Sequence, residues 1–200
     1  MTTIDHVLFD LGGVLVDFRG ISSLARRLGR AHDEMAESWL ASPAVRAYER
    51  GQIATDVFVD QIRAELDLDL DAREFEAEMA GWLPGLLDGA RKLVEDLRSH
   101  HVAISCLSNT NDLHWRRMRA WGVADWFEHH VLSHEIDMVK PDPEIFEHAT
   151  RVIAAAPERI LYFDDHPANV AAAQRSGLRS RRAQGPAQAR QALLEIGLLR

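Results

Sequence analysis

The chain has 200 residues, 46% of them apolar, and a formal net charge of -8 at pH 7. That length allows one folding unit with a smaller appendage rather than two domains of average size. The acidic balance, without a Lys/Arg-rich run or a basic amphipathic stripe, argues against nucleic acid and acidic membrane surfaces as partners.

The first apolar run, HVLFD at 6–10, has the length of a strand and ends in a carboxylate, Asp10, which Gly12 and Gly13 follow closely. A buried carboxylate is costly unless something pairs with it, and two glycines leave room beside it. This stretch therefore predicts a strand that presents Asp10 to a ligand.

Residues 18–84 contain helical patterns, such as TDVFVDQIRAEL, and no convincing strand. The segment ends at Pro84 and Gly85, which we interpret as a hinge. We expect an α-helical cap over 18–84, inserted into a core domain formed by 1–17 and 85–200. Such an insert would stand over the carboxyl ends of the strands, where open α/β sheets bind ligands.

Beyond the hinge, apolar runs of strand length alternate with segments of helical period. The predicted strands are 101–110, 129–135 and 159–165, with a weaker edge strand at 178–183. The predicted helices are 88–100, 143–155 (with Asp142 at the N-cap) and 167–177, and a turn at 183–190 leads into a final amphipathic helix. Continuously apolar strands that alternate with helices predict an α/β fold, a doubly wound Rossmann-like parallel sheet.

Polar side chains follow each main predicted strand. They are Asp10 after the first, Ser108 and Asn109 after the second, Lys140 after the third, and Asp164 with Asp165 after the fourth. Because parallel strands bring their carboxyl ends to one edge of a sheet, we expect these side chains to converge. Carboxylates, a hydroxyl and an ammonium in one cleft predict a site for Mg²⁺, which prefers oxygen ligands, and for a phosphate.

Four segments, FDLGGVLVD, LSNTN, MVKPDP and FDDHPANVAAA, occur in this order. They resemble the four motifs of the haloacid dehalogenase-like hydrolase superfamily, in its subfamily with a helical cap inserted after the first motif. The resemblance implies that Asp10 is a nucleophile that forms an aspartyl-phosphate, and that Ser108 and Lys140 hold the phosphoryl group. It also implies a Mg²⁺ site whose ligands are Asp10, the Gly12 carbonyl, Asp164 and Asp165. Phosphoryl transfer needs mainly positioning and charge neutralisation, which this set supplies.

One position departs from that pattern. Phosphatases of the superfamily usually carry a second Asp two residues after the nucleophile, as general acid and base, and here that residue is Gly12. Members with a DLG first motif and an ERG-containing cap, which YERGQIAT resembles, include phosphatases similar to glucose-1-phosphate phosphatase, so the loss does not imply inactivity. Without a proton donor, we expect good leaving groups such as the anomeric oxygen of a sugar 1-phosphate. Hydrolysis of the aspartyl-phosphate should be slow unless Asp17 or His166 acts on the attacking water.

The residues that contact the leaving group are less clearly marked. Glu49 and Arg50 of the predicted cap face either the substrate or the solvent. Asn109 either binds the substrate or serves the local turn. We take these three residues, together with Ser108 and Lys140, as candidate substrate-binding residues.

These features predict a Mg²⁺-dependent phosphatase, a phosphoric monoester hydrolase, for a small phosphorylated metabolite, with a sugar phosphate and especially a sugar 1-phosphate as first choice. Two alternatives stay open: a 2-haloacid dehalogenase-type hydrolase, which does not need Mg²⁺, and a catalytically impaired protein that binds a phosphometabolite. The single cysteine, Cys106, and the lack of a leader or a membrane-spanning apolar stretch predict a cytoplasmic protein. We expect a monomer or homodimer with no membrane or nucleic-acid partner.

Overall fold

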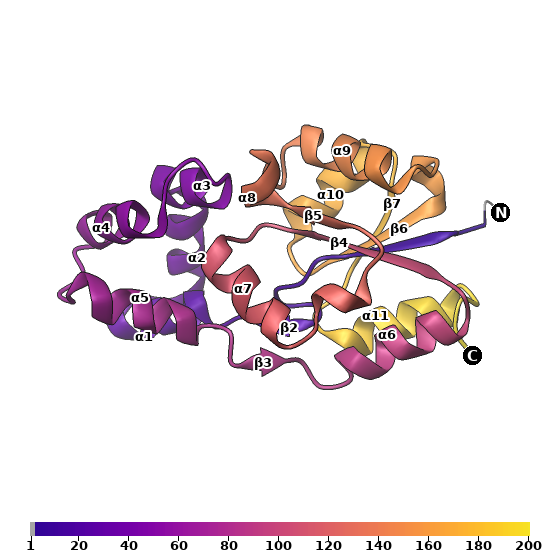
Figure 1. Ribbon diagram of the computed structural model, residues 1–200, viewed down its shortest axis with the longest axis horizontal. Coiled ribbons are helices and arrows are strands. Elements are labelled where there is room, and N and C mark those ends of the chain that lie inside the picture. Colours follow the sequence, from indigo (N-terminus) through magenta and orange to yellow (C-terminus); the bar gives the residue numbers. More distant parts are fainter. Residues whose placement is uncertain (1–2) are drawn as a thin grey trace.

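A parallel sheet of five strands forms the centre of the computed structural model, which describes residues 3–200 (Figure 1). In spatial order the strands are β5 (His130–Leu132), β4 (Ala103–Ser108), β1 (His6–Phe9), β6 (Ile160–Asp164) and β7 (Arg179–Arg182). The chain builds one side of β1 with β4 and β5 before it crosses to β6 and β7 on the other side. Strand order therefore reverses beside β1, which is where open α/β sheets bind ligands. The predicted fold class, including the edge strand, is confirmed.

Helices cover both faces of this sheet. Figure 1 shows α6 (Ala90–Ser99) and α11 (Pro186–Glu195) on one side, and α9 (Pro143–Ile153) and α10 (Pro167–Arg175) on the other. The apolar residues of α6 and α11 share one core cluster with α7 (Asp112–Ala120), whereas those of α9 and α10 form another. No helix within residues 3–200 combines the length and the apolar character needed to cross a membrane.

Five helices form an insert between the first strand and the rest of the sheet. They are α1 (Gly20–Leu28), α2 (His32–Ala41), α3 (Pro43–Glu49), α4 (Thr55–Glu65) and α5 (Ala72–Gly81). Figure 1 shows them grouped at one end of the sheet, and their buried side chains form an apolar cluster of their own. Two strands, β2 (Val16–Asp17) and β3 (Gly85–Leu86), pair antiparallel where the chain leaves for this insert and returns. Strands of two residues are too short for an apolar pattern to reveal, so the sequence does not predict this pair.

Two predicted boundaries are wrong by three residues or more. The strand expected at 129–135 ends at Leu132, because α8 (Ser133–Ile136) begins there and the Ser133 hydroxyl bonds to the backbone of Thr110. The turn expected at 183–190 ends at Gly185, since Pro186 takes the first position of α11, where its fixed φ and missing N–H suit a helix start. Two short 3-10 helices, η1 (Ala124–Trp126) and η2 (Pro157–Arg159), precede β5 and β6.

Candidate active site

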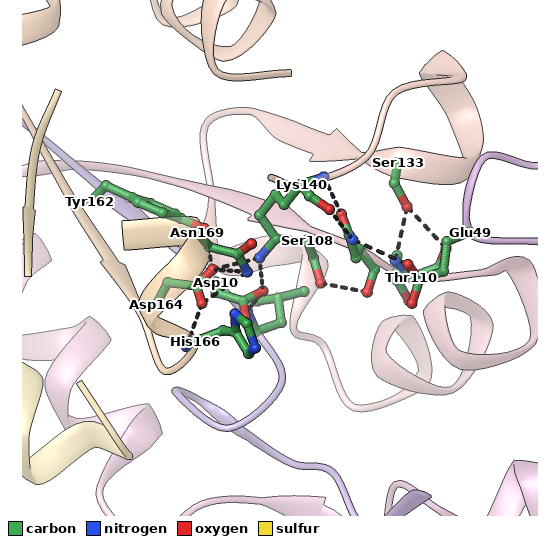
Figure 2. A network of polar contacts seen from close by, with 12 residues as sticks. Asp10, Glu49, Ser108, Thr110, Ser133, Lys140, Tyr162, Asp164, His166 and Asn169 are labelled. Atoms are coloured by element: carbon green, nitrogen blue, oxygen red, sulfur yellow. Dashed lines mark hydrogen bonds and ion pairs between the residues drawn. The ribbon is translucent and has the colours of Figure 1, made fainter. Parts of the chain in front are cut away.

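Asp10 directly follows β1 and lies at the carboxyl edge of the sheet (Figure 2). Its backbone N–H donates to the Phe163 carbonyl at 2.8 Å, which holds it beside the end of β6. The side chain is buried, and its Oδ1 accepts from the Leu11 N–H at 2.7 Å and pairs with Lys140 Nζ at 2.8 Å. Within residues 3–200 these are the partners of the carboxylate, so Oδ2 is available to a ligand in the cavity that Asp10 lines.

Lys140, in the loop after α8, links two of the predicted carboxylates. Its Nζ lies 2.8 Å from Asp10 Oδ1 and 2.7 Å from Asp164 Oδ2. The Asn109 amide fixes the Lys140 backbone, because Oδ1 accepts from its N–H at 2.8 Å and Nδ2 donates to its carbonyl at 3.1 Å. Burial lowers the pKa of Lys140, but the two carboxylates more than offset this and raise it above its ordinary value. The buried ammonium therefore stays charged.

Asp164, the last residue of β6, is held by four donors. Besides Lys140, they are the Tyr162 hydroxyl, the His166 N–H at 2.7 Å and Asn169 Nδ2 at 3.1 Å. Burial alone would raise the pKa of Asp164, but Lys140 and these hydrogen bonds lower it below its ordinary value. The sequence analysis did not single out Tyr162 and Asn169. Their positions, two residues before Asp164 and in the first turn of α10, are the signal that could have revealed them.

The three aspartates at the strand ends form a cluster that fits a metal ion. Asp10, Asp164 and Asp165 each offer a carboxylate oxygen, and these atoms lie within 4.8 Å of one another. Burial raises the pKa of Asp10 and that of Asp165, although Lys140 acts against both changes. Three carboxylates around one ammonium carry excess negative charge, which a hard divalent cation with a preference for oxygen would balance. The donor set fits Mg²⁺.

Gly13 makes room for Asp165 in this cluster. A Cβ on Gly13 would overlap the Asp165 carboxylate, and its φ of +72° is one that other residues rarely adopt. Asp165 has no ion pair among the described residues, whereas Asp164 already accepts from four donors. Asp10 and Asp165 are thus the carboxylates with free oxygens for direct ligation. The Gly12 backbone, the fourth predicted ligand, lines the same cavity.

Ser108 and Asn109 lie where β4 ends, and the structure gives them different tasks. Ser108 is buried in the cavity wall, and its Oγ makes one weak contact, 3.5 Å from the Asn109 carbonyl. Its hydroxyl is therefore free to bind a phosphoryl oxygen. The Asn109 amide is instead engaged on both sides, since Nδ2 also donates to Glu49 Oε2 at 3.1 Å. Asn109 positions Lys140 and Glu49 as well as lining the cavity.

Glu49 and Arg50, neighbours in the sequence, face different surroundings. Glu49 lines the cavity at the end of α3. Arg50 lies outside the cavity lining and pairs with Asp142 at 2.8 Å and with Asp137 at 3.3 Å. Asp142 occupies the predicted N-cap position of α9, but its carboxylate is used by Arg50 and Arg46 rather than by the helix. The structure therefore brings Glu49 to the site and uses Arg50 to join the insert to the core.

The two groups expected to act on the hydrolytic water are also separated. Asp17 pairs with Arg19 at 2.6 Å and is not among the residues that line the cavity. His166 does line it, directly after Asp165. Of the two, His166 alone reaches the site.

The insert gives the cavity an apolar, aromatic wall that the sequence analysis did not predict. The cavity has a volume of about 340 Å³, and Phe18, Trp39, Phe58 and Trp82 are among its lining residues. Trp82 Nε1 is buried and has no hydrogen-bond partner within residues 3–200. No sequence signal distinguishes a tryptophan that lines a cavity from one that only packs. This wall is the part of the cavity lining that lies away from the three aspartates.

Known proteins share this sequence pattern and fold. The profile described as haloacid dehalogenase-like hydrolase matches residues 4–177. The D-ribitol-5-phosphate phosphatase of Bacteroides thetaiotaomicron is 27% identical, over 96% of this chain and 98% of that protein. The (DL)-glycerol-3-phosphatase 2 of Arabidopsis thaliana is 25% identical, over 88% and 78%. A HAD family enzyme of B. thetaiotaomicron, solved in complex with magnesium and inorganic phosphate, is 28% identical with a TM-score of 0.72, over 90% and 93% of the two chains.

Proposed function

The chain belongs to the haloacid dehalogenase-like hydrolase family, and from this premise we propose that it is a Mg²⁺-dependent phosphatase of a small phosphorylated metabolite. The observation that carries the proposal is the position of Lys140, whose Nζ lies 2.8 Å from Asp10 Oδ1 and 2.7 Å from Asp164 Oδ2. An ammonium held beside a nucleophilic carboxylate lowers the repulsion between that carboxylate and an incoming phosphate.

In the proposed reaction Asp10 Oδ2 attacks phosphorus while the bond from phosphorus to the leaving oxygen breaks. The products are an aspartyl-phosphate and the leaving oxygen, which takes up a proton to become an alcohol. Lys140 and the Ser108 hydroxyl bind the phosphoryl oxygens and neutralise their charge. Water then attacks the same phosphorus, inorganic phosphate leaves, and the Asp10 carboxylate is restored.

Magnesium is the cofactor, as in the HAD family enzyme that was solved with magnesium and phosphate. We assign its binding to Asp165, the Gly12 carbonyl and the Asp10 carboxylate oxygen that does not attack phosphorus, with Asp164 beside them as the residue that holds Lys140 in place. When bound, the ion supplies further positive charge to the phosphoryl group.

We assign residues 18–84 to a cap domain, and residues 1–17 and 85–200 to the core domain that carries the phosphoryl chemistry. The aromatic wall of the insert and Glu49 line the same cavity as Asp10, which supports a role of the cap in selecting the leaving group. Closure of such a cap would also exclude water from the phosphoryl group.

A sugar or polyol phosphate is the substrate class that we propose. The names of two relatives, a ribitol-5-phosphate phosphatase and a glycerol-3-phosphatase, support this class. Gly12, together with the DLG and ERG segments, favours a sugar 1-phosphate within it, because an anomeric oxygen leaves readily.

A phosphate-release assay tests the proposal. The panel contains sugar 1-phosphates, sugar 6-phosphates, polyol phosphates, nucleotides and an aryl phosphate, each with Mg²⁺ and with a chelator, beside Asp10→Asn. We expect Mg²⁺-dependent release that Asp10→Asn abolishes, fastest with anomeric or aryl esters. Halide release from 2-haloacids without metal would instead indicate a dehalogenase, and tight binding without turnover would indicate a phosphometabolite-binding protein.

A further inference from the structure

The cavity contains one carboxyl group that the proposed phosphoryl chemistry does not use. Its acidic lining residues within the described part of the chain are Asp10, Asp165 and Glu49. The two aspartates belong to the metal cluster, and Glu49 comes from the insert. Figure 2 shows Glu49 across the site from Asp164 and His166. A carboxyl on the side away from the metal cluster is on the side where the leaving group has room.

The histidines of the cavity are poorly suited to protonate a leaving group there. His114 Nε2 lies 3.0 Å from the Met79 carbonyl and Nδ1 lies 3.3 Å from Asn111 Nδ2, so neither nitrogen is free. Burial lowers the pKa of His114, which keeps the ring neutral. His166 directly follows Asp165 and lies on the metal side of the site.

Two other titratable groups line the cavity, and both have partners elsewhere. The Tyr48 hydroxyl bonds to Thr55 Oγ1 at 2.9 Å, and burial raises its pKa. His32 is largely exposed and lies 3.4 Å from the Asp33 carboxylate. Glu49 therefore remains as the acid that faces the cavity from the insert.

Gly12, two residues after Asp10, has no side chain, so the core supplies no carboxyl group at this position. A Cβ built on Gly12 would meet only the Phe18 Cβ, at an ordinary contact distance of 3.7 Å. The backbone there thus accepts a side chain without strain, and the absence of a carboxyl is a property of this sequence rather than of its geometry. An acid supplied from another element would fill that chemical gap.

We propose, on the basis of the phosphatase function proposed above, that Glu49 protonates the leaving oxygen. In the first step Asp10 Oδ2 bonds to phosphorus, the phosphorus–oxygen bond of the ester breaks, and the Glu49 proton moves to the departing oxygen. In the second step water enters where the alcohol left, and its proton returns to the Glu49 carboxylate as its oxygen bonds to phosphorus. The bond between phosphorus and Asp10 Oδ2 breaks at the same time, which releases inorganic phosphate and restores the Asp10 carboxylate. The net reaction consumes one ester and one water and yields one alcohol and one phosphate.

The surroundings of Glu49 suit both steps. Burial raises the pKa of Glu49 to about 7, while Lys140, the Asn109 hydrogen bond and Arg46 oppose the rise. A catalytic acid works best when its pKa lies near the working pH, because both of its protonation states are then populated. The Asn109 contact at 3.1 Å also fixes the carboxyl relative to the loop that carries Lys140.

The test compares two esters that differ in their need for an acid. Glu49→Gln keeps the shape of the side chain and removes its proton chemistry. We expect its kcat/KM on an alkyl phosphate to fall by about 10²-fold or more, because an alkoxide is a poor leaving group. Its kcat/KM on 4-nitrophenyl phosphate should change by less than about 5-fold, since kcat/KM depends only on the steps up to release of the first product and that leaving group needs no proton. Glu37→Gln, at an exposed position on α2, is the matched control with both rates unchanged.

Restoring a carboxyl to the core provides a second test. In the Glu49→Gln background, Gly12→Asp should recover most of the lost alkyl rate. In the wild-type background, Gly12→Asp should not raise the alkyl rate by more than about 5-fold, because an acid is already present. The measurement on Gly12→Asp in the wild-type background does not depend on whether Glu49→Gln folds.

Three outcomes would contradict the proposed role of Glu49 or the phosphatase function on which it rests. Equal losses of kcat/KM on both esters in Glu49→Gln would overturn the assignment, since a structural role affects both. A large gain on the alkyl ester from Gly12→Asp in the wild-type chain would also overturn it, because no acid would then be acting there. Wild-type enzyme that releases phosphate from neither ester would instead refute the phosphatase function itself.

Discussion

The two ends of the cavity are built in different ways. The phosphoryl end, formed by Asp10, Ser108, Lys140, Asp164 and Asp165, comes from strand ends and the loop after α8. The insert end is formed by an aromatic wall and one carboxyl on α3. Pairing between strands fixes the first end, whereas the helices of the second can change without disturbing the sheet. We therefore propose that the first end carries the phosphoryl transfer and that the second contacts the leaving group.

Removal of Lys140 should have the largest effect, because it dismantles the phosphoryl end. Lys140→Ala leaves Asp10 and Asp164 buried without their ammonium, so we expect a loss of about 3–5 kcal/mol in the free energy of unfolding. We also expect kcat to fall by about 10³-fold. Denaturant titration and phosphate release measure the two losses. Lys92→Ala, which removes an exposed lysine from α6, is the control, and a Lys140→Ala enzyme with comparable turnover would contradict this role.

The next prediction concerns Asn109, which joins the two ends. Asn109→Ala removes its hydrogen bonds to the Lys140 backbone and to Glu49, so both groups lose their fixed positions. We expect kcat to fall by about 10- to 100-fold, the effect of a small misplacement of reacting groups. Asn111→Ala, in the same loop, is the matched control. The Asn111 side chain caps α7, so its removal should lower the free energy of unfolding by about 1 kcal/mol and change kcat little. Equal kinetic losses in both variants would argue against a positioning role of Asn109.

Glu49 should make stability depend on pH. Its folded-state pKa of about 7 lies above the ordinary value of 4.5, so the folded chain holds this proton more tightly than the unfolded chain. The stability that it contributes is complete below the unfolded pKa and is lost as pH rises through the folded pKa. Between about pH 5 and pH 8, the free energy of unfolding of the wild type should fall by on the order of 1 kcal/mol more than that of Glu49→Gln. Urea unfolding of both proteins at the two pH values measures this difference. If their stabilities changed equally with pH, Glu49 would lie in a solvated position.

The smallest effect is expected at Arg50, outside the cavity. Its pairs with Asp142 and Asp137 join the insert to the core but are partly exposed, so Arg50→Ala should cost about 0.5–1 kcal/mol. We expect KM to rise by less than about 10-fold, with kcat nearly unchanged. Arg27→Ala breaks a similar pair with Glu78 inside the insert, and should lower stability equally without changing KM. A large loss of kcat in Arg50→Ala would mean that Arg50 contacts the substrate.

The two ends of the cavity also differ in how well the sequence predicts them. Asp10, Ser108 and Asp164 follow or end continuous apolar runs, and parallel pairing then requires that they meet, so pattern and spacing are sufficient to place them. Glu49 and Arg50 stand next to each other, but successive residues at a helix end point about 100° apart. Which of them reaches the cavity depends on how the insert docks, and no local pattern contains that information.

The same limit explains the wrong boundaries in the core. The strand predicted at 129–135 extends past the end of β5 into Ser133, His134 and Glu135, and the contact of Ser133 with Thr110 accompanies the helical turn that begins there. That contact joins residues 23 positions apart, beyond the range of a periodic pattern. Pro186, in contrast, was a local signal for the start of α11 that the composition of the tail obscured.

The proposed function depends on covalent phosphorylation of Asp10. Rapid acid quench of the enzyme during turnover of an aryl phosphate, followed by mass spectrometry of the peptide that contains Asp10, detects this intermediate. An aryl ester makes the first step fast, so the intermediate accumulates before water removes it. We expect one phosphoryl group on that peptide, appearing and decaying at rates that match turnover, and none in Asp10→Asn. Phosphate release at full rate from an enzyme whose Asp10 peptide never gains a phosphoryl group would contradict it.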